Sequence, residues 1–124
     1  MANNFRMINF AAEPASSGSP YVMYEAGSGV TAIVLGLVLS NIHTSQVTAT
    51  VNLVSTTANR GGATGSLVSN GTSVIIKDAP IPVGSSLELM AGNKVVLEVD
   101  DQITIDCSVA DKLSGTLSIM EITA

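Results

Sequence analysis

The fold class follows from the segment Val30-Thr31-Ala32-Ile33-Val34-Leu35-Gly36-Leu37-Val38-Leu39. This run is apolar on both faces of an extended chain, apart from one threonine and one glycine. After a polar break comes Val47-Thr48-Ala49-Thr50-Val51-Asn52-Leu53, in which apolar and polar residues alternate strictly. A period of two, rich in valine and threonine, is typical of β-strands. A strand apolar on both faces needs a cover on each, so the first run is predicted to be central in a sheet or to contact another chain.

Further short strands are predicted along the chain, separated by turns at roughly eight-to-twelve-residue spacing, and no segment shows a helical period. Pro80 and Pro82 cannot lie in a central strand, so the chain is predicted to cross an edge or change sheet there. Asn70-Gly71 predicts a two-residue type I′ hairpin. With Thr72 it also matches the N-glycosylation pattern, but no secretory signal is visible and the hairpin is favoured. The sequence therefore predicts an all-β antiparallel sandwich or jelly roll of eight or nine strands over residues 21–124.

Composition points to a protein whose surface is buried in an assembly. Charged residues make up 12% of the chain, about half the usual ~25%. Between Ala26 and Ile76 only Arg60 carries a formal charge. A net charge of −5 with five scattered basic residues argues against nucleic acid as a partner. We expect a closed homo-oligomer, most simply a trimer.

No residue pattern predicts catalysis, a cofactor or a bound metal. Cys107, the single cysteine, is in phase with apolar neighbours and is predicted to be a buried thiol. His43 lies in a polar loop with no acidic residue nearby to orient it. The pair Asp100-Asp101, considered with Asp106 as a calcium site, lacks the alternating ligand pattern and is predicted to be a solvated turn. The sequence therefore favours a binding protein over an enzyme.

Residues 1–20 are predicted to form an extended arm, because two prolines and an irregular pattern follow Phe10. All four aromatic residues of the protein, Phe5, Phe10, Tyr21 and Tyr24, lie at this end. Large rings are natural interface anchors, so the arm is predicted to dock on an adjacent subunit. The alternative is that it folds back over its own sandwich. No signal peptide is recognised, and Val30–Leu39 is shorter than the ~20 residues of a membrane-spanning helix, so no membrane partner is expected.

Several stretches resemble small virion structural proteins of tailed bacteriophages, especially those of marine cyanobacteria. They are Ile81-Pro82-Val83-Gly84-Ser85-Ser86-Leu87, Lys94-Val95-Val96-Leu97-Glu98 before the Asp-rich turn, and the closing Leu117-Ser118-Ile119-Met120-Glu121-Ile122-Thr123. The segment from Ala32 to Asn41 also resembles their first core strand. This resemblance covers roughly residues 25–123. It implies a β-sandwich structural protein present in many copies, located in the virion after synthesis in the host cytoplasm, and it carries no catalytic residues.

From these observations we expect a capsid decoration (cement) or similar accessory subunit that binds itself and other virion proteins such as the major capsid protein. A carbohydrate-binding module of a tail or fibre is the alternative, which the lack of tryptophan disfavours. The residues expected at interfaces are Phe5, Arg6, Phe10, Tyr21, Tyr24, Ile33, Leu35, Leu37, Leu39 and Arg60. The residues expected to point into the core are Val47, Ala49, Val51, Leu53, Val95, Leu97, Ile103, Ile105, Leu117 and Ile119.

Overall fold

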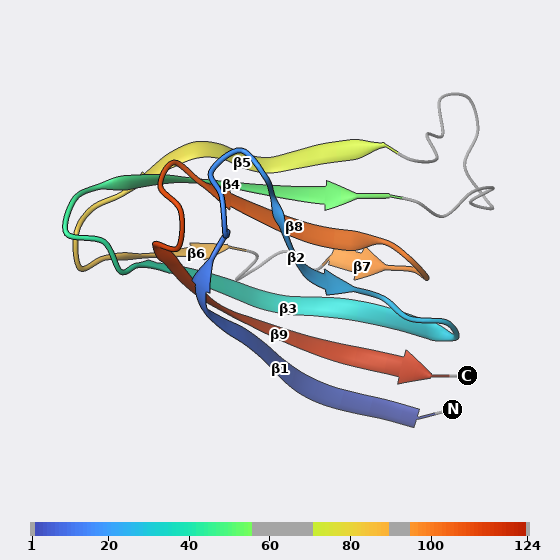
Figure 1. The fold of residues 1–124 in the computed structure, drawn as a ribbon. Coiled ribbons are helices and arrows are strands. Elements are labelled where there is room, and N and C mark those ends of the chain that lie inside the picture. Colours follow the sequence, from blue (N-terminus) through green and yellow to red (C-terminus); the bar gives the residue numbers. More distant parts are fainter. Residues whose placement is uncertain (1, 56–70, 90–94, 124) are drawn as a thin grey trace.

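A computed structural model describes residues 2–55, 71–89 and 95–123, and every regular element in these ranges is a β-strand (Figure 1). Within them, no helix is present that could cross a membrane. The strands are β1 (Ala2–Glu13), β2 (Tyr21–Glu25), β3 (Val30–Asn41), β4 (Val47–Val54), β5 (Thr72–Ile81), β6 (Ser86–Leu89), β7 (Val95–Leu97), β8 (Gln102–Cys107) and β9 (Leu113–Thr123).

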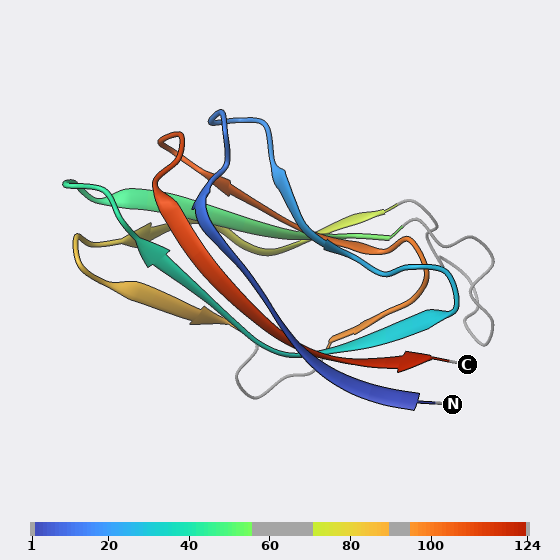
Figure 2. The ribbon, with the colours of Figure 1, turned by 60° about the horizontal axis from the view of Figure 1, so that its bottom comes forward.

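The strands form two antiparallel sheets that pack against each other and twist together (Figure 2). The first has the order β1-β9-β3-β6, with β7 also paired to β3, and the second has the order β2-β8-β4-β5. Consecutive strands lie in different sheets, except for the pairs β4–β5 and β6–β7, and this is the interleaved order of a jelly roll. The predicted fold class is confirmed.

β3 is a central strand, as its two apolar faces predicted. It pairs with β9 along one side, and on the other with β6 and then β7. The register with β9 shifts between Val34 and Gly36, so Leu35 is the additional residue of a β-bulge. On either side of the bulge, Val34 and Leu37 point into the sandwich and are buried.

Pro80 lies in β5 and Pro82 directly follows it, at a position that agrees with the sequence-based prediction. β5 is an edge strand, and Pro80 pairs with Thr48 of β4 there. Pro82 follows the strand, and the chain then enters the other sheet at β6. Both consequences expected from these residues, an edge position and a change of sheet, are confirmed.

The core lies between the sheets and is built mainly from aliphatic side chains. Of the ten residues predicted to point inward, eight are buried, while Leu53 and Val95 are partly buried and pack against the same cluster. Phe10 and Tyr24 also belong to this core. The strand phases derived from alternating residues are therefore correct.

The separate N-terminal arm is corrected by the structure. Residues 2–13 form β1, an edge strand that pairs with β9 of the same chain from Ala2↔Thr123 to Glu13↔Leu113. The physical reason is that β9 would be an edge strand without β1. Its backbone N–H and C=O groups need hydrogen-bond partners, and β1 supplies them. Ile8 and Phe10 point inward from β1, so this strand also closes one side of the core.

Two sequence-based predictions fall, wholly or in part, on residues that the structure does not describe. They are the hairpin at Asn70-Gly71, of which Asn70 lies outside the described residues, and the interface role of Arg60.

Candidate interaction face

The residues that carry a functional interpretation lie on the side of the first sheet that faces away from the second sheet, which we call the outer face. Side chains alternate along each strand, so the partners of β1, β9, β3 and β7 form rows across this side. One row runs Phe5–Met120–Ile33–Val96, one residue from each strand. The row brings together side chains from both ends and the middle of the chain.

Two side chains of β1 and one of β7 project strongly from the outer face. The exposed fractions are 74% for Phe5, 66% for Met7 and 55% for Val96. Met120 and Ile33 between them are half-buried. A folded monomer exposes single apolar side chains routinely, but a contiguous apolar row is characteristic of an interaction site.

The outer face is also uncharged over these four strands. Taken row by row, the described outward residues there are all neutral: Asn3, Phe5, Met7, Asn9, Thr31, Ile33, Gly36, Val38, Val96, Thr116, Ser118, Met120 and Ile122. Glu88 of β6, opposite Val38, is the acidic residue at the rim. Because the whole protein carries a net charge of −5, this neutral region stands apart from the rest of its surface.

A hollow of about 310 Å³ opens on the outer face beside the bulge of β3. It forms because Gly36 has no side chain and the extra residue Leu35 displaces the strand locally. A Cβ added at Gly36 would meet no atom within 4 Å. The residues around the hollow are Leu35, Gly36, Leu37, Val38, Glu88, Leu89, Thr116 and Ser118.

The structure places some of the expected interface residues on the outer face and others in the core. Phe5, Ile33 and Leu35 lie on the outer face or line its hollow. Leu37 and Leu39, as well as Phe10 and Tyr24, are buried in the core of their own sandwich. These four are therefore structural, and placing them at an interface is corrected, because the bulge of β3 turns Leu37 and Leu39 inward, while Phe10 and Tyr24 point into the core from β1 and β2.

Tyr21 packs on Phe10, with ring centroids 5.2 Å apart and planes tilted by 59°. It is partly buried, so it belongs with the core and not with a surface platform. Met7, Val96 and Met120 were not among the residues expected at interfaces, and Val38 was included only as part of the apolar run from Val30 to Leu39. They are found only once the pairing of distant strands is known.

Arg6 and Tyr24 meet at Glu121, which links the two sheets. The Tyr24 hydroxyl donates a hydrogen bond of 2.7 Å to Glu121 Oε2, and Arg6 forms a salt bridge with Oε1 of the same carboxylate. Burial and the hydrogen bond to the Glu121 carboxylate raise the pKa of the Tyr24 phenol above its ordinary value of 10.0. Arg6 therefore helps to hold the edge strand β1 in place, while its side chain remains largely exposed.

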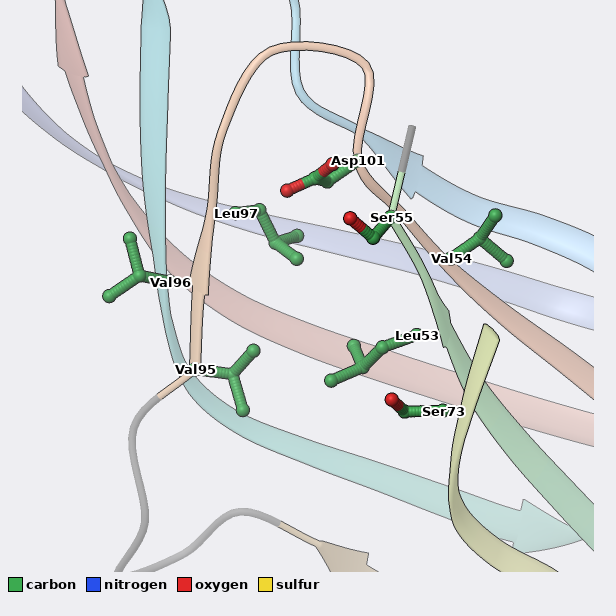
Figure 3. A pocket seen from close by; sticks show the side chains of 8 residues that line it. All are labelled: Leu53, Val54, Ser55, Ser73, Val95, Val96, Leu97 and Asp101. Atoms are coloured by element: carbon green, nitrogen blue, oxygen red, sulfur yellow. The ribbon is translucent and has the colours of Figure 1, made fainter. Parts of the chain in front are cut away.

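A second pocket, of about 170 Å³, opens between the sheets where β7 faces β4 (Figure 3). Val95 and Leu97 point toward Leu53 across it, whereas Val96 on the same strand points away to the outer face (Figure 3). Asp101 at its rim accepts the backbone N–H of Glu98 at 3.1 Å and thereby organises the turn between β7 and β8. This pocket is therefore an opening into the core, and the carboxylate of Asp101 at its rim already accepts a hydrogen bond from the backbone.

A polar depression of about 150 Å³ lies on the other sheet, with Asp78 and Asp106 at its sides. Asp106 Oδ1 accepts the backbone N–H groups of Cys107 at 2.8 Å and Gly18 at 3.1 Å. Among the described residues, no group of three or more His, Cys, Asp or Glu side chains is placed to hold a metal ion. Asp100, Asp101 and Asp106 do not converge in such a group.

The two residues singled out as possible chemical groups have structural surroundings. Cys107 is buried with a free thiol, as predicted. The backbone N–H of His43 donates to Asn41 Oδ1 at 2.7 Å, and Asn41 Nδ2 donates to the carbonyls of Ser45 and Ile81 at 3.0 and 2.9 Å. Asn41, the last residue of β3, thus organises the loop around His43.

Comparison with known proteins adds one similarity of fold. No protein-family model matches the sequence, and no curated protein matches it significantly. Among solved structures, the chain is similar to one from Bacillus endospore appendages, described as a novel family of disulfide-linked pili. The two share 18% identity with a TM-score of 0.46, over 98% of this chain and 87% of the other. The function proposed below does not rest on this similarity.

Proposed function

We propose that this protein is a structural subunit of a tailed-bacteriophage virion, a capsid decoration or similar accessory protein that acts by binding its neighbours. The observation that carries the proposal is the outer face, a neutral surface crossed by an apolar row on an otherwise acidic protein. Such a face is costly to leave in water, and burying it against other subunits stabilises an assembly. The resemblance of residues 25–123 to phage structural proteins supports the same assignment.

The jelly-roll order is compatible with this function but does not select it. Jelly rolls occur in viral capsid domains and in lectins, so the fold offers an analogy to both of the functions considered. Sugar-binding platforms usually present an exposed aromatic ring. Here Tyr24 is buried and Tyr21 is packed on Phe10, so Phe5 is the exposed ring and no second ring lies beside it to form a platform. This arrangement favours the structural function over the carbohydrate-binding one.

The proposal is tested by locating the protein on particles. Virions purified by density gradient are analysed by mass spectrometry, and gold-labelled antibody to this protein is imaged on them. We expect a regular label at many sites per particle. Presence in the infected-cell lysate with absence from purified virions would contradict the proposal.

A further inference from the structure

The outer face carries one projecting feature and one hollow feature. It carries a projecting ring, Phe5, and a hollow over Gly36, and both lie on the same side of the same sheet. An apolar cavity of about 150 Å³ is enough to hold a benzene ring, so a hollow of about 310 Å³ has room for the ring of Phe5. Two copies facing each other across a two-fold axis would satisfy both features twice.

We propose that two copies of this chain pack outer face to outer face, with the Phe5 ring of each inserted into the hollow over Gly36 of the other. This inference deepens the proposed function, on which it rests for the premise that the outer face is an interface. It replaces the expected trimer with a dimer, because a sheet face covers one opposing face.

Charge favours a second copy over a charged partner. The described outward residues of β1, β9, β3 and β7 are neutral, so face-to-face packing brings no like charges together in the centre. The acidic Glu88 borders the hollow from β6, and because its side chain is exposed, its carboxylate can remain in water beside the inserted ring. A charged partner would gain no ion pair from such a surface. An identical neutral face buries no charge, and its polar side chains can form hydrogen bonds with those of the other copy.

The available area is close to what a stable dimer needs. β1, β9 and β3 contain 12, 11 and 12 residues, and β6 and β7, which pair with the other side of β3, contain 4 and 3. At ~3.4 Å per residue and ~4.8 Å between strands, these five strands cover about 700 Å². A standard protein–protein interface buries about 800 Å² on each partner. The outer face is therefore large enough to hold two copies together.

Sedimentation velocity across the micromolar range tests the inference. The wild-type protein should sediment at twice the 12.6 kDa chain mass and dissociate on dilution. Gly36→Val fills the hollow without strain, since the site is open and its backbone lies outside the left-handed region. Phe5→Ser removes the ring. Each substitution should raise the dissociation constant at least about tenfold.

Two matched valines provide the control. Val96 on the outer face and Val74 on β5 of the other sheet are 55% and 54% exposed. Val96→Gln should weaken the dimer, whereas Val74→Gln should leave it unchanged. A wild-type monomer at all concentrations, or a dimer that Gly36→Val, Phe5→Ser and Val96→Gln all leave intact, would overturn the inference.

A cross-link keeps the test decisive if a substitution disturbs folding. In the double variant Phe5→Cys/Gly36→Cys the contact is weakened, so oxidation is carried out at high protein concentration, where the disulfide should trap it as a covalent dimer. Each single variant should remain monomeric on a non-reducing gel. Lack of cross-linking in a double variant that is dimeric in solution would place the contact elsewhere. Because these readouts use the isolated protein, a monomer that still decorates virions refutes the dimer alone, and a dimer absent from virions refutes the proposed function alone.

Discussion

At the scale of single residues, Gly115 in β9 is the position with the least room. A Cβ there would lie 2.4 Å from Cε2 and 2.6 Å from Cζ of Phe10, whose ring therefore rests on the glycine. We expect Gly115→Ala to destabilise the fold by about 1–3 kcal/mol, measured by urea denaturation, because the ring must move. Phe10→Leu should relieve the clash, so the double variant should lose less than the sum of the single losses. Additive losses would show that the ring is not the obstacle.

Ile105 and Thr104 test the inner and outer sides of β8. Both are buried, Ile105 in the core and Thr104 on the outward side between its partners Val22 and Asn52. Ile105→Ala should cost ~2–5 kcal/mol of unfolding free energy. From the sequence, Thr104→Ala would be close to neutral; its burial in a central strand revises this to a loss of about 1 kcal/mol. Equal shifts in melting temperature would show that the assigned sides of β8 are wrong.

Tyr24 gives the protein a specific alkaline sensitivity. Its pKa is raised in the folded state, so the unfolded chain loses this proton at lower pH than the folded one. The protonated Tyr24 therefore makes its full contribution to the unfolding free energy below pH 10.0, the ordinary pKa of the phenol. This contribution declines as the pH rises above that value. We expect the wild-type unfolding free energy to fall more steeply above about pH 10 than that of Tyr24→Phe. Parallel pH profiles would contradict this.

At the scale of elements, β1 is the strand whose observed role differs most from the one predicted from the sequence. It pairs only along one side, with β9, yet it supplies Phe10 to the core and Arg6 to the bridge at Glu121. We expect deletion of residues 1–13 to lower the melting temperature sharply and to abolish the cooperative near-ultraviolet transition. A truncated chain that keeps the native circular dichroism and melting temperature would support the docking arm instead.

Strands with one wet and one buried side were accessible to sequence reasoning, and β1 was not. β4 and β8 show the alternation that a core imposes, so their phases and buried residues followed directly. β1 carries Phe5 and Met7 outward and Ile8 and Phe10 inward, and asparagines interrupt both sides. An edge strand is held largely by backbone hydrogen bonds, which leave no periodic signal in the sequence.

At the scale of the whole molecule, composition indicated that part of the surface is uncharged but not which part. The rows of the outer face join β1, β9, β3 and β7, whose residues are far apart in sequence. Only the jelly-roll pairing brings Phe5 beside Met120, or Gly36 beside Ser118. The existence of an uncharged face could therefore be predicted from the sequence. Its position on the molecule could be found only from the pairing of the strands.

The pairing of β1 with β9 also governs how the chain reaches its native state. During synthesis β1 is made long before β9. The side chains of Ile8 and Phe10 therefore lack the neighbouring strand β9 until the end of the chain has been made. Closing so long a loop is slow, and all-β folds dominated by such pairings refold in about milliseconds to seconds. Stopped-flow refolding should place this protein in that range, with β1 joining last. Until then the free edge of β9 can capture β1 from another chain, so crowded synthesis should produce strand-exchanged aggregates that dilution prevents.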